Sequence, residues 1–281
     1  MVTVVVFEFG VMRCQPLRRA LCNRGGMEEY KQYRDAINSI RHYAVNNKFS
    51  KSCSENYLCP SCKSQTLSVD WKTITSWHTR KSKLYMDECR DLLLGWDNEE
   101  SELQFIGRLI CECGEVIAIS GNSKYQEEVE SDGSGEQYKF VDEKYEIKYF
   151  SRAIQTFYAP DNTPSQCVRI LEEAFQLFHL NQSASGNRLR VLLEFIVDDL
   201  LGSESQKINK LNDKIGRLNK LMPDIKDLAD LNRILGNLAS HKNGLSYDDL
   251  TSAFYFVDHL LQRAYGEQYK MLRFMLPKSF T

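Results

Sequence analysis

Two pairs of closely spaced cysteines are the feature that most constrains how this chain can fold. Cys59 and Cys62 stand as C-P-S-C, and Cys111 and Cys113 stand as C-E-C-G. A tight turn can present two thiolates to one ion, and a glycine-containing hairpin turn can present two more. Four thiolates form a tetrahedral zinc site with no open coordination position, so we expect a structural Zn²⁺ rather than a catalytic one. One pair precedes a strand-like stretch and the other occupies a hairpin turn, which is typical of a zinc ribbon.

Two features depart from the usual ribbon. Only one residue separates Cys111 from Cys113, and residues 63–110 lie between the two pairs. The alternatives are a redox C-x-x-C motif and unrelated free thiols, but the βαβ unit expected around a thioredoxin-like motif is not visible. Cys53 is a reserve ligand. We expect the remaining cysteines to be unliganded: Cys14, Cys22, Cys89 and Cys167.

Composition limits the partners and the compartment. The net charge is −2, so the basic excess of a typical nucleic-acid-binding chain is missing and any such binding needs a local patch. No apolar run reaches the roughly 20 residues that span a bilayer, and the first residues do not read as a signal peptide. We therefore expect a cytoplasmic protein with no membrane partner, in which nine cysteines serve as metal ligands or free thiols. Met27 suggests a natural start, with residues 1–26 an over-long start or a loose arm.

Hydrophobic patterning divides the chain near residue 155. The spacing predicts a helix over 28–46, strands from Leu67, a helix over 84–94 and a hairpin over 103–119. A loop or linker is expected over 121–136, followed by two short strands at 137–141 and 145–150. Beyond Pro160 the periodicity is helical. The helices are expected at 167–180, 184–201, from 203 or 205 to 221, at 223–241, and from a Ser246 cap with Asp249 at the third position.

These elements predict an α+β chain, in which a small β-rich zinc-ribbon-like module precedes an all-α bundle of about five helices. The expected units are an arm and helix over 1–50, the zinc-ribbon-like module over 51–150, and the helical bundle over 155–275.

Three polar residues share one face of the expected fourth helix. Arg233, Asn237 and His241 are spaced i, i+4, i+8. They could form a polar seam within the bundle, a metal-free ribonuclease site with His241 as acid/base and Arg233 on a phosphate, or a binding site for nucleotide or nucleic acid without chemistry. Phosphate-loop, metalloprotease and serine-hydrolase motifs are not found. Arg190 and Glu194, on the second expected helix, have the spacing of an ion pair.

The C-terminal region, over roughly residues 155–265, resembles the domain of unknown function family 4145. The resemblance rests on Pro164, Glu173–Ala174, Arg190 with Glu194, and the R-x-x-G-N-x-x-x-H pattern of Arg233, Gly236, Asn237 and His241. It implies a HEPN-like helical bundle of the kind found in restriction-enzyme subunits and in bacterial proteins near defence genes. In HEPN ribonucleases an Arg and a His act together at a dimer interface, but here Arg233 and His241 stand farther apart than in those enzymes.

The leading hypothesis is a non-catalytic, zinc-containing interaction or nucleic-acid-sensing protein linked to bacterial defence or restriction. One alternative is a HEPN-like, metal-independent endoribonuclease that uses Arg233 and His241. Another is a structural partner subunit or dimerisation module. The expected partners are RNA, DNA or a protein, and we expect a homodimer.

Overall fold

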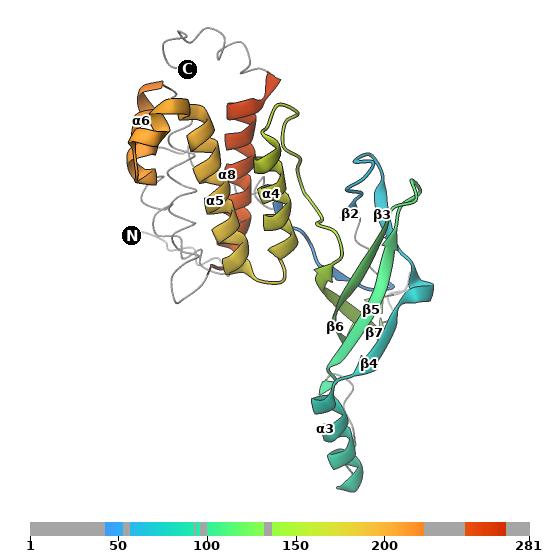
Figure 1. Ribbon diagram of the computed structural model, residues 1–281. Helices are drawn as coiled ribbons and strands as arrows, with labels where there is room; N and C mark the ends of the chain where they lie inside the picture. The colour runs from blue at the N-terminus through green and yellow to red at the C-terminus, as the bar shows by residue number, and fades with distance from the viewer. Residues whose placement is uncertain are drawn as a thin grey trace, which may run out of the picture.

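A curled sheet and a group of helices lie side by side, joined by the segment 151–164 (Figure 1). The computed structural model describes residues 43–52, 57–92, 94–95, 100–131, 137–221 and 245–267. Helix α3 (Arg80–Asp91) projects from the end of the sheet away from the other helices.

The sheet is antiparallel and has seven strands. Six of them follow the order β1-β7-β6-β5-β3-β2, and the seventh, β4, pairs with the first part of β5, whereas β3 pairs with its last part. The short helix η2 (Trp71–Thr73) interrupts the path from β3 to β4. The strands are β1 (Lys48–Phe49), β2 (Tyr57–Leu58), β3 (Thr66–Val69), β4 (Thr75–His78), β5 (Leu103–Ile110), β6 (Val116–Ser131) and β7 (Gln137–Phe150).

One face of the sheet forms an apolar interior because hydrophobic residues alternate along its central strands. On β5 the side chains of Leu103, Phe105 and Leu109 are buried, whereas the residues between them are mostly exposed. Phe49 and Tyr145 stack there with ring centroids 4.9 Å apart. The predicted hairpin over 103–119 is confirmed as the first part of the β5–β6 pair.

The acidic stretch 121–136 was expected to be a loop or linker. This prediction is wrong for residues 121–131, which belong to β6, and residues 132–136 lie outside the described residues. Strand β6 continues to Ser131 and pairs with β7 as far as Ser131↔Gln137. Few apolar residues are needed there because this outer part of the hairpin is held by cross-strand pairing. The ion pair between Lys139 Nζ and Glu127 Oε2 at 3.1 Å is one such contact.

The helical part consists, in the described residues, of four α-helices and a short 3₁₀ helix. They are α4 (Ser165–Leu177), α5 (Gln182–Leu201), η4 (Gly202–Lys207), α6 (Leu211–Leu221) and α8 (Tyr247–Tyr265). The predicted cap of α8 is confirmed, since Ser246 Oγ accepts a hydrogen bond from the amide of Asp249 at 3.1 Å.

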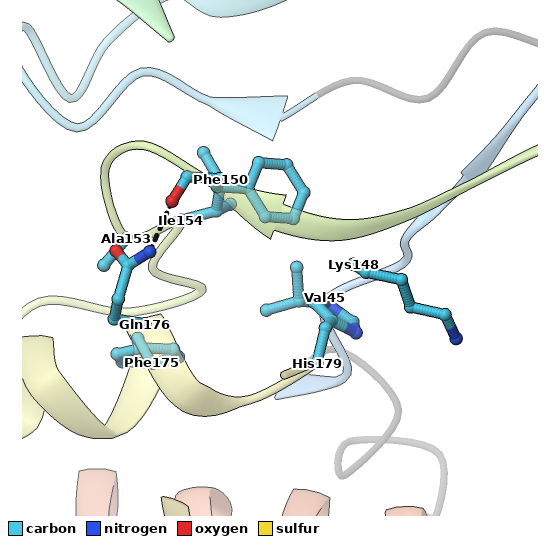
Figure 2. Close-up of a pocket in the computed structure, with 8 residues that line it drawn as sticks. All are labelled: Val45, Lys148, Phe150, Ala153, Ile154, Phe175, Gln176 and His179. Carbon is cyan, nitrogen blue, oxygen red and sulfur yellow. Dashed lines mark hydrogen bonds between the residues drawn. The ribbon is translucent and has the colours of Figure 1, made fainter. Parts of the chain in front are cut away.

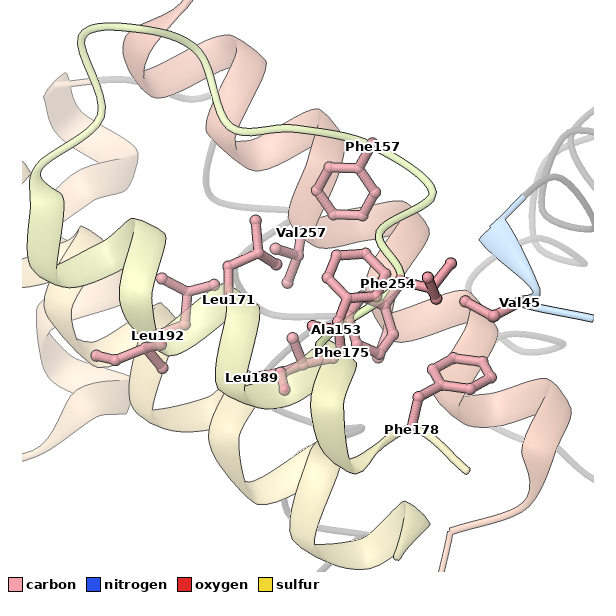
Figure 3. Packing of buried hydrophobic residues seen from close by; sticks show 14 of the residues in the cluster. Val45, Ala153, Phe157, Leu171, Phe175, Phe178, Leu189, Leu192, Phe254 and Val257 are labelled. Atoms are coloured by element: carbon pink, nitrogen blue, oxygen red, sulfur yellow. The ribbon is translucent and has the colours of Figure 1, made fainter. Parts of the chain in front are cut away.

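An aromatic cluster forms the centre of the helical core (Figure 3). Phe175 of α4 and Phe254 of α8 have ring centroids 4.4 Å apart, and Phe178 lies 5.3 Å from Phe254. Phe157, from the joining segment, packs against Phe175 at 5.2 Å. The joining segment is therefore part of the helical core rather than a free tether.

The core continues from the sheet into the helices without a break. Figure 2 shows the junction, where the end of β7, the joining segment and the end of α4 surround a cavity of about 10 Å³. Gln176 Nε2 donates a hydrogen bond to the carbonyl of Phe150. Val45 also lines this cavity, and its carbonyl accepts a hydrogen bond from Tyr247 Oη at 2.7 Å.

The expected fold class, a small zinc-ribbon-like module followed by an all-α HEPN-like bundle of about five helices, is wrong. The N-terminal part is a large curled half-barrel that carries its own helix α3. The helical part is the smaller unit, and the described residues hold five α-helices in total, including α3. The error arises because β6 and β7 are long strands of largely polar sequence, so their extent is not visible in the hydrophobic pattern.

None of the helices in the described ranges is both long enough and apolar enough to cross a membrane.

Candidate functional site

The four predicted cysteine ligands come together at one end of the sheet. Cys59 and Cys62 lie in the turn between β2 and β3, and Cys111 and Cys113 lie in the turn between β5 and β6. Strands β3 and β5 are neighbours, with Ser68 paired to Ile110, so their turns meet. The long insertion between the pairs does not prevent closure. Within it, β4 pairs with β5 and α3 projects from the end of the sheet, so β5 still returns beside β3.

Backbone hydrogen bonds shape both turns. The amide of Lys63 donates to the carbonyl of Cys59 at 2.9 Å, and Lys63 itself has φ 56°. In the second turn the amide of Gly114 donates to the carbonyl of Cys111 at 2.9 Å. Gly114 has φ 95°, a backbone conformation that residues with a Cβ rarely adopt. The single residue between Cys111 and Cys113 therefore suffices to present both thiols to the first turn.

The sulfur positions match a tetrahedron around one metal ion. Cys59 Sγ lies 3.7 Å from Cys113 Sγ, and Cys62 Sγ lies 3.8 Å from Cys111 Sγ. All four sulfurs lie within 4.8 Å of one another. Zinc–sulfur bonds of about 2.3 Å give tetrahedral edges of about 3.8 Å. The cluster could therefore hold a metal ion.

Burial and charge also suit a metal. Cys59 and Cys111 are buried, whereas Cys113 lies at the surface. Hydrogen bonding from the backbone amide of Ser64 lowers the pKa of Cys62 to about 6. The amide of Cys113 lowers the pKa of Cys111, but burial and the neighbouring thiols outweigh it and raise that pKa to about 12. A bound cation would remove this opposition, because metal coordination deprotonates a thiol.

A second layer of contacts fastens the two turns to each other. Glu115 accepts hydrogen bonds from Ser61 and from Arg152, whose Nη1 lies 2.6 Å away. The Ser61 hydrogen bond is the largest of the effects that hold the pKa of Glu115 below its ordinary value. Gln65 Nε2 also donates to Glu112 Oε2 at 3.2 Å. The sequence did not single out these residues, since nothing in their spacing indicates that they meet.

The cluster also touches the segment that leads to the helices. Tyr158 Oη donates to the carbonyl of Cys59 at 3.4 Å, and Lys63 Nζ lies 4.5 Å from the centroid of the Tyr158 ring. Arg152 belongs to the same segment. A metal bound here would thus fix the first residues after the sheet.

The other sequence candidates have different outcomes. Cys14, Cys22 and the reserve ligand Cys53 lie outside the described residues, as do Arg233, Asn237 and His241. Cys89 and Cys167 are buried and are not part of the cluster. The predicted ion pair between Arg190 Nε and Glu194 Oε1 is confirmed at 3.4 Å.

A groove of about 770 Å³ crosses strands β1, β7, β6 and β5. We call it the polar groove because most of its lining residues are polar, and it was not predicted from the sequence. One row of its lining runs across four strands, through the register pairs Lys48↔Glu146, Glu146↔Asn122 and Asn122↔Gln104. Paired residues in a sheet project from the same face. A neighbouring row pairs Lys124 with Lys144.

Ion pairs account for both carboxylates in the groove lining. Glu102 binds Lys81 at 2.8 Å, and Glu146 binds Lys148 at 2.5 Å. Lys48 and Lys124 stand outside these pairs. Two aromatic side chains project from the same face of the sheet: Trp77, paired with Gln104, and Tyr149, paired with Ser120, are 41% and 45% exposed.

Comparison with known families divides the chain into two matched regions. Residues 47–150, which contain all of the paired strands, match the family described as Domain of unknown function (DUF8608). Residues 172–278 match the family described as Domain of unknown function (DUF4145), to which the C-terminal region is therefore similar. A search of curated proteins and a search of solved structures each found no match.

Proposed function

We propose that this chain is a non-catalytic, zinc-containing protein that binds single-stranded nucleic acid, in the setting of bacterial defence or restriction. The observation that carries the zinc centre is the tetrahedral arrangement of the Cys59, Cys62, Cys111 and Cys113 sulfurs. Soft thiolate ligands in tetrahedral geometry select zinc or an iron–sulfur cluster. One ion fits the sulfur–sulfur distances, which favours zinc.

The zinc is proposed to act structurally. Four protein thiolates fill its coordination shell and leave no position for water or substrate. The ion would fix the β2–β3 turn and the β5–β6 turn relative to each other. It would also fix the joining segment, because Arg152 and Tyr158 both contact the cysteine turns.

Cobalt substitution tests the coordination. Purified protein refolded with Co²⁺ is expected to show the intense visible and near-ultraviolet bands of tetrahedral cobalt–thiolate, at one Co²⁺ per chain. The Cys62→Ser variant is expected to lose the four-thiolate spectrum, whereas Cys89→Ser keeps it. Octahedral cobalt spectra in the wild-type protein would contradict a four-cysteine site.

The polar groove supports the nucleic-acid part of the proposal. Single strands bind to surfaces that combine cations along the backbone with aromatic rings on which bases stack. Lys124 supplies a cation with no ion pair among the described residues, and Lys48 adds a second cation beside Glu146. Trp77 and Tyr149 supply exposed rings on the same face. In the Lys124↔Lys144 pair, the charge of Lys144 is already balanced by Glu128 and Asp142, each at 3.0 Å, so Lys124 is the cation of this pair that is left for a phosphate.

Mobility-shift titrations with single-stranded RNA and DNA test this surface. We expect the double variant Lys48→Glu/Lys124→Glu to weaken binding by about 10-fold or more and to reduce the salt slope by about one per lost phosphate contact. Lys72→Glu is the control, because it makes the same lysine-to-glutamate change at a site outside the groove. Equal affinity of the groove variant and the control would refute the assignment.

A metal-independent ribonuclease is the second candidate, because the DUF4145 match spans both Arg233 and His241. Chelator-treated protein and its His241→Ala variant are compared for RNA cleavage. Cleavage that is lost only in the variant would replace the non-catalytic proposal, and no cleavage by either protein agrees with it.

A further inference from the structure

Helix α3 makes little contact with its own chain. It projects from the end of the sheet (Figure 1), and its buried side chains are only Ser82 and Cys89. A helix of 12 residues is marginal in water without packing. Two of the leucines at this end of the molecule, Leu84 and Leu92, are 59% and 60% exposed. These two leucines therefore have no cover among the described residues.

The charges of α3 run against its own dipole. The first turn carries Arg80 and Lys81 and has no acidic residue, whereas the last turn carries Glu88 and Asp91 and only one basic residue, Arg90. The amino end of a helix is positive and the carboxyl end negative, so each of these charges is placed where it is unfavourable within a single helix. An antiparallel neighbouring helix would make these charges favourable, because its negative carboxyl end would lie beside Arg80 and Lys81 and its positive amino end beside Glu88 and Asp91.

The charges are also symmetric about Leu84. Arg80 and Glu88 lie four residues on either side of it, and Lys81 and Asp87 lie three residues on either side. Each pair joins opposite charges. A two-fold interface requires that residue i of one copy meets residue j of the other while j meets i. An antiparallel pair of α3 helices with its axis at Leu84 satisfies this for both pairs.

We propose that α3 is a self-association surface that pairs antiparallel with α3 of a second copy of this chain. Leu84 meets Leu84 of the partner subunit at the axis, and Arg80 of each copy pairs with the other copy's Glu88. Neither Arg80 nor Glu88 takes part in an ion pair within the described chain. Lys81 and Asp87 already have partners, Glu102 at 2.8 Å and Arg90 at 3.2 Å, which are exposed contacts that can exchange.

The interface is small. A three-turn helix pair buries less than the 1,200–2,000 Å² of a standard protein interface, so the dimer is expected to form at high protein concentration and to weaken with added salt. This dependence on concentration and salt distinguishes the α3 dimer from a large, permanent interface elsewhere on the molecule.

Complementary charge variants test the pairing. The acidic variant is Arg80→Glu/Lys81→Glu, and the basic variant is Asp87→Lys/Glu88→Lys. Sedimentation velocity and light scattering are used to compare wild type, each variant and an equimolar mixture. Wild type is expected to approach twice the 32.6 kDa chain mass. Each variant alone is expected to remain at the chain mass, and the mixture to restore the dimer.

Three results would overturn the proposal: a wild type that stays monomeric at all concentrations, variants that dimerise alone as wild type does, or a mixture that does not dimerise. Circular dichroism and thermal melting check that both variants are folded. As an independent measurement, Leu84→Cys is expected to form an intermolecular disulfide on mild oxidation, because the axis brings the two copies of this position together. Leu94→Cys, equally exposed but beyond the helix, is the control and is expected not to form one.

Discussion

Arg152 contacts both cysteine turns, so it is expected to influence the proposed metal site without binding the metal. Its guanidinium donates to both Ser61 and Glu115 at 2.6 Å, one residue from each cysteine turn. Residues that orient ligands in this way commonly affect metal affinity as strongly as 10–100-fold. Removing the Arg152 side chain is therefore expected to weaken metal binding without removing a ligand.

We expect His179 to make the stability of the protein depend on pH. Its ring lies between Phe150 and Phe178, Nε2 has no hydrogen-bond partner, and burial lowers its pKa to about 4. The unfolded chain, with a histidine pKa near 6.5, binds the proton more readily. The free energy of unfolding is thus expected to fall as the pH drops from about 6.5 to about 4, by up to about 3 kcal/mol.

The His179→Phe variant isolates this effect, because it keeps an aromatic ring and removes the titrating group. Urea unfolding of wild type and variant is measured at several pH values between 4 and 7. The difference between the two is expected to follow the histidine titration. Parallel pH profiles would show that His179 does not carry the effect.

At the scale of the elements, the sequence predicted those helices and strands that a local residue pattern is enough to identify. The β5–β6 hairpin was recognised from β-branched and aromatic residues around a glycine-containing turn, and α8 from its Ser246 cap. The outer half of β6 was missed because both of its faces are largely polar, so no alternation marks it. Strand β7 was expected only as two short strands, at 137–141 and 145–150. Two-residue strands such as β1 exist only through pairing with distant β7, which a local pattern cannot show.

The cap of α8 gives a direct test at this scale. Ser246→Ala removes the side chain that accepts from the Asp249 amide, and the expected loss is about 1 kcal/mol of unfolding free energy. Ser246→Gly, which leaves the amide open to water, is expected to cost only a few tenths of a kcal/mol. Equal losses in the two variants would argue against a capping role.

Two glycines are expected to respond in opposite directions to alanine. In α6, a Cβ at Gly216 meets nothing within 4 Å, so Gly216→Ala is expected to stabilise the protein by about 0.5–1 kcal/mol. In β6, a Cβ at Gly121 would lie 2.0 Å from the carbonyl oxygen of Glu146. Gly121→Ala is expected to destabilise by about 1–3 kcal/mol, and chemical denaturation of both variants checks the two signs.

At the scale of the whole molecule, one apolar core joins sheet and helices. The segment 151–164 contacts the cysteine turns through Arg152 and Tyr158 and enters the aromatic cluster through Phe157. The sequence identified the four cysteines, since their spacing is itself the signal. It did not show that the joining segment touches them, because those contacts link residues about 40–100 positions apart, which only the folded chain brings together.

The central claim is that the four cysteines hold one structural zinc ion, and metal analysis of the purified chain tests it most directly. Zinc per chain and melting temperature are measured for wild type, Cys59→Ser and the control Cys89→Ser. We predict about one zinc in wild type and in the control. In Cys59→Ser we predict its loss, with a melting temperature lower by about 10 °C, since several kcal/mol of stability are lost with the metal. A metal-free wild-type protein whose melting temperature is unchanged in Cys59→Ser would contradict the account.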